Sequence, residues 1–346
     1  MTKLDVLVDL QFGSTGKGLL SGYLSEKTEY GAAISNNMPN AGHTAYSSNS
    51  GKKFVHKVLP SGIFSRGMQI IGIGPGSVFF PDRLVQEWEG VCEERNDLLL
   101  VIHEAAAIAI LEDAEKERQS LSRIASTMQG SAEALIRKIR REPGAIAKHW
   151  SSSLEYRLNL HGKAIVVNQF VWLDMMGSLD RVLVEGSQGY SLGLSAGFYP
   201  NCTSRDCTVG RVLADCNLPV KWLNDVYGCA RVHPIRVGNT LDGYSGDWYP
   251  DQRETTFEDL MVEPEKTTVT GRVRRVASFS YTQIREAMMM AHPTAVFLNF
   301  AQYDAVSTAE AHIAIDSVAK EIGCGTVKYL GMGPTSSDII EFVRKS

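Results

Sequence analysis

Residues 4–18 read LDVLVDLQFGSTGKG, and the fold can be predicted from this segment outward. Its first seven residues predict a buried strand, the glycine-rich residues after them a loop, and the apolar spacing over 19–24 a helix. Backbone N–H groups at the start of such a helix, together with the charge of Lys17, favour a bound phosphate. The loop departs from the standard P-loop, because Gln11 and Gly18 stand where that motif needs Gly and Ser or Thr. An ordinary turn is the alternative interpretation of this loop taken alone.

The rest of the chain alternates short apolar runs with helical patterns, which is typical of an α/β fold with a mainly parallel central sheet covered on both faces. Apolar runs predict strands at 70–73, 98–102, 164–167, 182–184 and 295–300. Helical spacing predicts helices at 82–94, 104–119, 132–141, 281–291, 308–322 and 337–345. No flexible linker divides the chain, so we expect one large domain over 1–346 with a surface insertion at about 238–266.

The composition argues against several classes of function. The 346 residues include 35 Lys and Arg against 39 Asp and Glu, a net charge of −4, so we expect no basic groove for nucleic acid. The sequence has neither an export signal nor an apolar stretch of about 18 residues, so we expect a cytoplasmic protein with no role at a membrane. The six cysteines form no C-x-x-C pair, which argues against a metal cluster.

Three further loops gather polar groups where little core could form. Residues 36–44 read NNMPNAGHT, residues 185–189 read EGSQG after a predicted strand, and residues 267–275 read TTVTGRVRR. Each loop is a weak signal alone, because a lone histidine such as His43 usually lies on the surface and the second loop suits a plain strand-to-helix turn. Alternating arginines beside hydroxyls suit bidentate binding of a carboxylate, although a solvated basic face is the alternative.

Taken together and in order, the loops resemble those of the adenylosuccinate synthetase family. The family signature is a Q-W-G-D-E-G-K-G loop, an N-A-G-H-T loop, an E-G-x-Q-G loop and a T-T-G-R-x-R aspartate loop, which correspond here to 11–18, 40–44, 185–189 and 269–274. Further matches at 56–62, 199–204 and 331–334 extend the resemblance over nearly the whole chain. It implies the α/β fold of that family, with a P-loop-like phosphate loop, and a magnesium-dependent ligase. In that reaction a nucleoside triphosphate phosphorylates O6 of a purine monophosphate, and the amine of aspartate then displaces the phosphate from C6.

The resemblance also implies a role for each matching residue. The positions concerned are catalytic (Ser14, Lys17, His43, Gln188), or bind the acceptor nucleotide (Ser14, Asn40, Thr127, Arg141, Gln188, Thr203, Ser204), aspartate (Thr270, Arg272, Arg274), the donor triphosphate (Thr15, Gly16, Lys17, Gly18, Thr44, Gln302, Gly331, Gly333, Pro334) or magnesium (Ser14, Gly42). His43 would be the general acid on the phosphoryl oxygens. Arg141 matches an arginine that family members insert into the neighbouring subunit's site, which implies a homodimer. Val269 replaces the first threonine of the aspartate loop.

Ser14 is the first departure from the family signature, which has an aspartate there that acts as base on N1 of inosinate. A hydroxyl cannot replace a carboxylate base, so either the enzyme is inactive or its substrate has changed. The other motifs are intact, which favours a changed substrate. We hypothesise that the shorter Ser14 admits the 2-amino group of guanylate and accepts a hydrogen bond from it. This matches the phage branch of the family, whose members make N6-succino-2-amino-2′-deoxyadenylate for diaminopurine nucleotide synthesis.

The second departure is at the donor base. Family members read the guanine of GTP with a T-K-x-D motif, whereas residues 299–302 here read NFAQ. The Gln302 amide offers the donor and acceptor that adenine needs, and Phe300 can stack on a base. We therefore expect a ligase that joins L-aspartate to C6 of dGMP or GMP with ATP or dATP. A loop misaligned by one residue is the alternative.

Two other functions are left open by the sequence. One is an adenylosuccinate synthetase that acts on IMP with GTP, and the other is a purine-nucleotide-binding regulator without turnover. A dinucleotide-dependent dehydrogenase is excluded, because no G-x-G-x-x-G motif follows the first strand.

Overall fold

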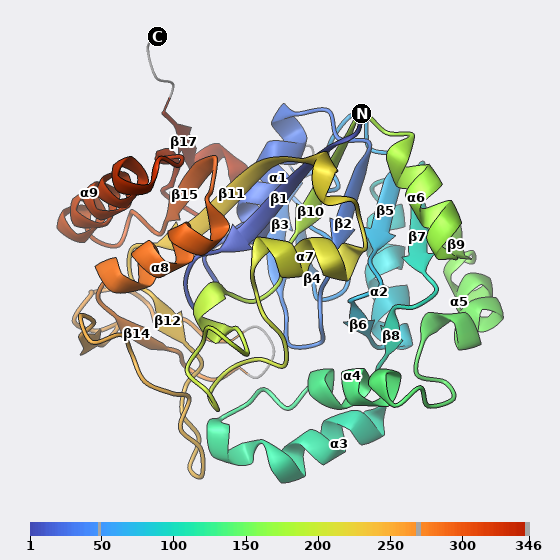
Figure 1. The fold of residues 1–346 in the computed structure, drawn as a ribbon, viewed down its shortest axis with the longest axis horizontal. Helices are drawn as coiled ribbons and strands as arrows, with labels where there is room; N and C mark the ends of the chain where they lie inside the picture. Colours follow the sequence, from blue (N-terminus) through green and yellow to red (C-terminus); the bar gives the residue numbers. More distant parts are fainter. Residues whose placement is uncertain (48–49, 268–270, 343–346) are drawn as a thin grey trace.

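The computed structural model describes residues 1–47, 50–267 and 271–342. A ten-stranded sheet runs through them in the order β17-β16-β15-β11-β1-β10-β2-β5-β7-β9 (Figure 1). Its strands are β1 (Lys3–Asp9), β2 (Ala32–Ser35), β5 (Ile70–Ile73), β7 (Leu99–His103), β9 (Ala164–Val167), β10 (Arg181–Glu185), β11 (Leu223–Arg231), β15 (Ala295–Asn299), β16 (Val327–Gly331) and β17 (Ile339–Glu341). All pairs are parallel except β16 with β17. The predicted α/β fold with a mainly parallel sheet is confirmed.

Helices cover both faces of this sheet because successive side chains of a strand point to opposite faces. In β1, Leu7 packs with helices α1 (Lys17–Lys27), α2 (Pro81–Cys92) and α5 (Ser151–Leu158) on one face. Leu4, Val6 and Val8 pack on the other face with α6 (Gln169–Gly177), α7 (Val209–Cys216), α8 (Tyr281–Ala291) and α9 (Ala305–Ile322). Burial on both faces explains why the strands read as continuous apolar runs.

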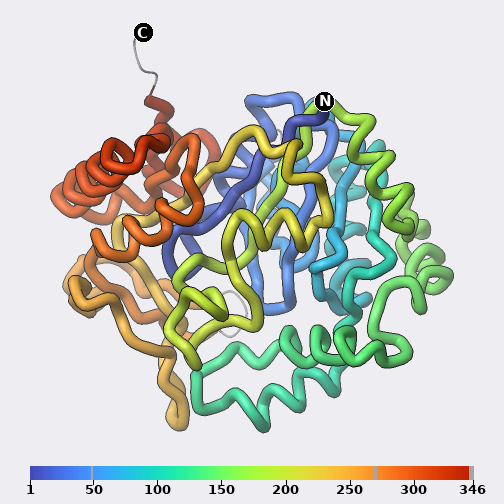
Figure 2. Tube along the Cα trace, in the orientation of Figure 1, coloured from blue at the N-terminus to red at the C-terminus, as the bar shows by residue number. Residues whose placement is uncertain are grey.

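Smaller elements gather beyond the carboxyl ends of the strands. They are the hairpin β3 (His43–Tyr46) and β4 (Lys53–His56), the pair β6 (Val78–Phe79) and β8 (Ala107–Ile108), helices α3 (Leu111–Ser120) and α4 (Ser131–Ile139), and a sheet of β12 (Ile235–Arg236), β14 (Arg275–Ala277) and β13 (Glu254–Thr255). Short 3₁₀ helices lie at η1 (Ser122–Ile124), η2 (Ala147–Trp150), η3 (Tyr190–Leu192), η4 (Val220–Trp222) and η5 (Ser336–Asp338). Figure 2 shows the α3–α4 segment passing along this end of the molecule. Ligands of open α/β sheets bind at this end of the strands.

Two predicted helices are wrong in extent or type. The helix predicted at 104–119 begins at Leu111, because Ala107 and Ile108 are buried in β8 and pair with β6. The helix predicted at 337–345 is the 3₁₀ helix η5 followed by β17, and its last residues lie outside the described part. The segment 238–266, predicted as a surface insertion, contributes β13 to the small sheet and buries Tyr249 and Phe257. Among the described residues, no helix combines the length and apolarity needed to span a membrane.

Candidate active site

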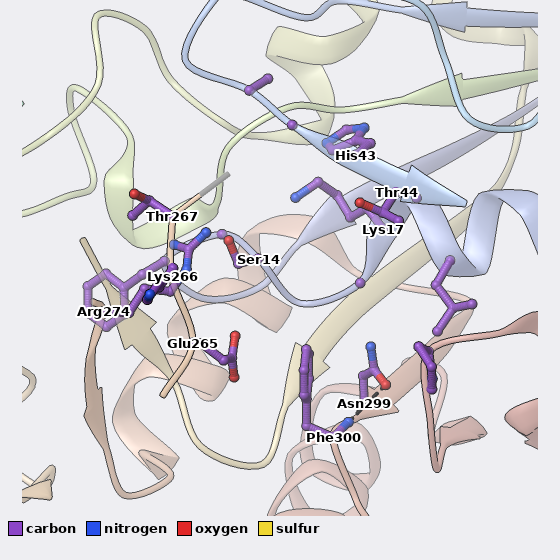
Figure 3. Close-up of a pocket in the computed structure, with 18 of the residues that line it drawn as sticks. Ser14, Lys17, His43, Thr44, Glu265, Lys266, Thr267, Arg274, Asn299 and Phe300 are labelled. Carbon is purple, nitrogen blue, oxygen red and sulfur yellow. Dashed lines mark hydrogen bonds between the residues drawn. The ribbon is translucent and has the colours of Figure 1, made fainter. Parts of the chain in front are cut away.

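A cleft of about 520 Å³ opens where the loops after β1, β2, β10 and β15 converge. It is lined by residues of every loop singled out above, among them Ser14, Gly16, Lys17, Gly18, Asn40, Gly42, His43, Thr44, Thr127, Gln188, Arg274, Gln302, Gly333 and Pro334. Figure 3 shows Lys17, His43 and Thr44 on one side of Ser14, with Glu265 and Arg274 across from them. Loops far apart in the sequence therefore meet in one site.

The phosphate loop is built around the carboxylate of Asp9. Its Oδ1 accepts hydrogen bonds from the backbone N–H groups of Gln11 (2.9 Å) and Gly13 (3.1 Å). Its Oδ2 accepts from the hydroxyl of Thr15 (2.5 Å) and from Nζ of Lys17 (3.0 Å). The carboxylate thus fixes the turn and holds the buried lysine beside it.

Two backbone features open this loop toward the cleft. Gly16 has φ +93°, and a Cβ there would lie 2.1 Å from the side-chain amide nitrogen of Asn299, so only glycine fits. Ser14 also has positive φ (56°), and it is exposed while its neighbours Gly13 and Thr15 are buried. The Ser14 hydroxyl is therefore presented to the cleft by a strained backbone conformation.

His43 is oriented by a buried carboxylate. Oε2 of Glu185 lies 3.0 Å from its Nδ1, and both side chains are almost completely buried. Because a carboxylate accepts hydrogen bonds and does not donate them, the proton sits on Nδ1, which leaves Nε2 for the cleft. Oε1 of Glu185 also accepts from the backbone N–H groups of Ser61 (2.5 Å) and Gly62 (2.8 Å).

A chain of amide and hydroxyl groups joins three loops at the acceptor side. Nε2 of Gln188 donates to Oδ1 of Asn40 (3.2 Å), and Nδ2 of Asn40 donates to Oγ1 of Thr203 (3.5 Å). Lys17 Nζ donates to the carbonyl of Gln188 (2.9 Å), which ties this chain to the phosphate loop. Thr203 lies behind Asn40, outside the lining, and the buried hydroxyl of its neighbour Ser204 has no hydrogen-bond partner among the described residues.

The predicted aspartate loop is divided between two environments. Arg274 lines the cleft, and burial lowers the pKa of its guanidinium to about 10, so it is charged at neutral pH. Arg272 lies outside the lining, where its guanidinium donates to the backbone carbonyls of Ala125 (2.9 Å), Ser126 (3.0 Å) and Gly238 (3.2 Å). Thr270 lies outside the described residues.

The segment after β15 forms the opposite wall. Nδ2 of Asn299 donates to the carbonyl of Thr15 (3.2 Å), and Phe300 follows with φ 60°. Phe300 and Gln302 line the cleft, whereas Gly331 lies against Asn299, whose Oδ1 would be 2.1 Å from a Cβ at that position. This wall is therefore held against the phosphate loop by Asn299.

Arg141 lies away from the cleft. It is exposed just beyond the end of α4, with φ 61°. Thr15 is another predicted residue outside the lining, and its hydroxyl donates to Asp9. Arg141 and Thr15 therefore contribute nothing to the lining of the cleft.

Sequence reasoning gave no role to several residues that organise the site. They are Asp9, Glu185, Arg231, Glu265 and Tyr303. Asp9 and Glu185 stand at the ends of predicted buried strands, where a charged residue needs a partner, and that signal could have found both. Arg231 ends β11, a strand that was not predicted, so the sequence pattern gave no reason to single it out.

The oxygen atoms at the cleft suit magnesium only together with the phosphates of a bound nucleotide. No group of three or more His, Cys, Asp or Glu that could hold a metal occurs in the described part of the chain. The Ser14 hydroxyl and the Gly42 carbonyl belong to exposed residues that line the cleft. Magnesium prefers oxygen ligands and is usually bound through one or two protein groups plus substrate phosphates. The residues therefore fit an ion carried in by a nucleotide.

Together the fold and the cleft define a nucleotide-dependent phosphoryl-transfer enzyme, with a lysine-bearing phosphate loop, a carboxylate-oriented histidine and a charged guanidinium in the lining. The family model of adenylosuccinate synthetase matches residues 6–159 and 144–315. The chain belongs to the adenylosuccinate synthetase family, as its loops predicted.

Relatives within the family have two kinds of name. The chain is 43% identical over 343 residues, 98% of each chain, to the N6-succino-2-amino-2′-deoxyadenylate synthase of Vibrio phage phiVC8. It is 29% identical to the adenylosuccinate synthetase of Shouchella clausii, covering 85% of this chain and 76% of the relative. Among solved structures, the cyanophage S-2L succinoaminodeoxyadenylate synthetase bound to dGMP and dATP matches with a TM-score of 0.87 and 37% identity, covering 99% of this chain and 95% of that one.

Proposed function

We propose that this protein is a ligase that joins L-aspartate to C6 of dGMP with ATP or dATP, giving N6-succino-2-amino-2′-deoxyadenylate for diaminopurine nucleotide synthesis. The observation that carries the proposal is Ser14, exposed at the cleft where the family signature has an aspartate. The 43% identity to a phage synthase over nearly the full chain supports the same substrate. The substrates are cytoplasmic metabolites, so the enzyme acts in the cytoplasm, which is that of the host cell if a phage encodes it.

Ser14 accommodates the guanine base in this proposal. The amino group at C2 of guanine is adjacent to N1, where the aspartate of the signature acts. A carboxylate at this position would crowd the C2 amino group, whereas the shorter Ser14 side chain leaves room and its oxygen accepts a hydrogen bond. In this proposal Ser14 contacts the base of the acceptor nucleotide. The side chains of Gln188 and Asn40, which are hydrogen-bonded to each other, orient that nucleotide.

The reaction then proceeds in two steps. O6 of the purine attacks the γ-phosphorus of the donor, the N1 proton of the base passes to water, and the bond to the β-phosphate oxygen breaks. The amine of aspartate next attacks C6 and gives up a proton to water, the bond from C6 to the phosphorylated oxygen breaks, and phosphate leaves. Lys17 neutralises charge on the phosphates, and His43, when both ring nitrogens carry a proton, is placed to donate the one on Nε2 to the phosphoryl oxygens. Magnesium, held by the nucleotide phosphates with Ser14 and Gly42, supplies charge neutralisation when bound.

The remaining substrates occupy the two outer walls. Arg274 binds a carboxylate of aspartate, and Thr270 and Arg272 are the further aspartate-binding residues that the family loop implies. Gln302 reads the adenine edge of the donor and Phe300 stacks on it, while Gly333 and Pro334 line the same wall. Arg141, exposed beyond α4, reaches the acceptor phosphate in a partner subunit, so the active form is a homodimer.

The deciding experiment crosses acceptors and donors. Purified protein with magnesium and aspartate is given dGMP, GMP or IMP, each with ATP, dATP or GTP, and nucleoside diphosphate and product mass are measured. We expect turnover with dGMP and ATP or dATP. Turnover with IMP and GTP but none with dGMP and ATP would make the chain an adenylosuccinate synthetase. Nucleotide binding without phosphate release in any combination would make it a regulator.

A further inference from the structure

Arg231, the last residue of β11, lies fully buried behind the cleft. Its Nη1 donates to the carbonyl of Ser14 (3.1 Å) and to Oε2 of Glu265 (3.1 Å), and its Nη2 donates to Oε1 of Glu265. Its Cζ lies 3.8 Å from the centroid of the Phe300 ring. A single planar cation therefore contacts three different loops.

Each of these contacts belongs to a loop with a different proposed ligand. Ser14 faces the acceptor purine and Phe300 the donor base, as argued above. Glu265 stands at the root of the aspartate loop, where its carbonyl accepts a hydrogen bond from the N–H of Arg274 (2.9 Å). Lys266 and Val273 form an antiparallel bridge next to this root. Glu265 and Arg274 therefore stand at the base of the segments 265–267 and 271–274, which we call the aspartate hairpin.

The pair of Arg231 and Glu265 has little freedom to rearrange. Burial raises the pKa of the Glu265 carboxyl, but the charges of Arg231 and Arg274 and the hydrogen bonds from Arg231 and Tyr303 together lower it by more. The net shift is downward and the carboxylate stays ionised. The hydroxyl of Tyr303 also donates to Oε1 of Glu265 (3.0 Å), and its ring packs edge-on against Phe300 with centroids 5.4 Å apart. Buried charges are stable only when paired, which fixes this arrangement.

The three loops do not depend on Arg231 to the same degree. The phosphate loop that carries Ser14 is also held by Asp9 through several hydrogen bonds. By contrast, Glu265 and Phe300 receive their charged contact from Arg231. Loss of the guanidinium would therefore disturb the donor and aspartate walls more than the acceptor side.

We propose that Arg231 is a positioning residue that couples the donor-nucleotide and aspartate sites, by supporting the stacking face of Phe300 and by fixing the root of the aspartate hairpin through Glu265. The assignment of the two walls rests on the proposed function. A donor purine stacked on Phe300 holds that ring against Arg231, and Arg231 holds Glu265 beneath Arg274. Occupation of one site therefore improves the affinity of the other.

Steady-state kinetics of Arg231→Lys and Arg231→Met test this coupling. Lysine keeps the charge but loses the flat, bidentate group, and methionine keeps only the volume. We expect the KM values for ATP and aspartate to rise together, by about tenfold in Arg231→Met and less in Arg231→Lys, with KM for dGMP changing by less than about twofold. Glu265→Gln should reproduce the effect on aspartate.

Arg181→Lys and Arg181→Met are the matched controls. Arg181 forms a guanidinium–carboxylate pair with Asp5 (2.7 Å) at the opposite end of the sheet, so we expect KM values within about twofold of the parent. If the Arg231 variants raise all three KM values equally, or lose thermal stability with KM unchanged, Arg231 is only structural and the proposal is wrong.

Equilibrium binding separates this proposal from the proposed function. Calorimetric titration of ATP into the protein, with and without aspartate, needs no turnover. We expect aspartate to tighten ATP binding in the parent and to have no effect in Arg231→Met. Equal binding with and without aspartate in the parent would overturn the coupling even if turnover occurs, and coupling without turnover would overturn only the proposed reaction.

Discussion

Oε2 of Glu185 lies 3.0 Å from Nδ1 of His43, at the point where the last residue of β10 meets the first residue of β3. This contact gives the imidazole one tautomer and provides a counter-charge when the ring is protonated. In Glu185→Gln the counter-charge is lost while the shape is kept. We expect kcat to fall by about 100-fold, the scale of general acid–base catalysis, with KM for dGMP changing only a few-fold. Stopped-flow measurement of phosphate release would give the rate.

Ser21→Ala is the matched control for this variant, because the Ser21 hydroxyl donates to Oε1 of the same carboxylate without touching His43. It should reduce kcat by less than about threefold, since one neutral hydrogen bond is lost. An equal loss of kcat in the two variants would show that packing around Glu185 matters and that its contact with His43 does not.

Ser14→Asp tests whether residue 14 determines which substituent is accepted at C2 of the acceptor base. The carboxylate would occupy the space proposed for the 2-amino group. We therefore expect kcat/KM for dGMP to fall by about 100-fold or more and kcat/KM for IMP to fall far less. Ser14→Ala keeps the space but removes the acceptor, and a loss of about tenfold is expected there. Unchanged dGMP turnover in Ser14→Asp would mean that this residue does not face C2.

Gln302→Asp tests how the donor base is read. A carboxylate only accepts hydrogen bonds, so it loses the donor that adenine needs at N1 or N7 and gains a match to the N1–H and 2-amino groups of guanine. We expect KM for ATP to rise by about tenfold and the preference for ATP over GTP to narrow or reverse. Gln302→Glu, one methylene longer, is the companion variant. If the preference for ATP over GTP is unchanged in both variants, other residues of that wall recognise the donor base.

The sequence predicted the central part of the fold well, for a physical reason. Strands buried on both faces read as continuous apolar runs, so 70–73 and 164–167 match β5 and β9. The strand β11 begins with partly exposed residues and ends in Arg231, so it lacks such a run. The predicted helix at 337–345 failed because a short edge strand paired to β16 is decided by tertiary contacts, which spacing alone does not encode.

The residues of the site also fall into two groups, those that the sequence could predict and those that it could not. Residues that line the cleft, such as Lys17 and Gln188, belong to loop motifs and could be named in advance. Partners such as Asp9 and Arg231 act on those loops from behind, and their importance follows from distances between strands that only the folded chain brings together. Arg272, expected at the ligand, instead braces backbone carbonyls of a neighbouring loop.

Arg274 predicts a pH dependence of aspartate binding. Burial lowers the pKa of its guanidinium to about 10, with Glu265 opposing that shift and Arg231 adding to it. Because the pKa of a cation is lowered, the charge is complete at neutral pH and is lost as the pH rises through about 10. We expect the affinity for aspartate, measured by calorimetry, to be nearly constant up to about pH 9 and to fall between about pH 9 and pH 11. Arg274→Met should bind weakly at every pH and remain flat over that range.

Arg141 predicts that active sites are shared between subunits. It is exposed beyond α4 and lies outside the cleft of its own chain, so its proposed contact with the acceptor phosphate needs a second subunit. His43→Ala and Arg141→Leu should each be nearly inactive as pure proteins, for different reasons. The first loses the general acid of its own site, and the second deprives the partner's site of a phosphate ligand.

Mixing these two variants under conditions that exchange subunits should restore activity. In a mixed dimer, the chain that keeps His43 receives Arg141 from its partner, so one of the two sites is complete. Random pairing makes half of the dimers mixed, and the mixture should reach about a quarter of the parent kcat. A mixture of Arg141→Leu with itself after the same exchange gives the baseline. Activity that stays at the sum of the two pure variants, in a sample shown to be dimeric by sedimentation, would place Arg141 outside the partner's site.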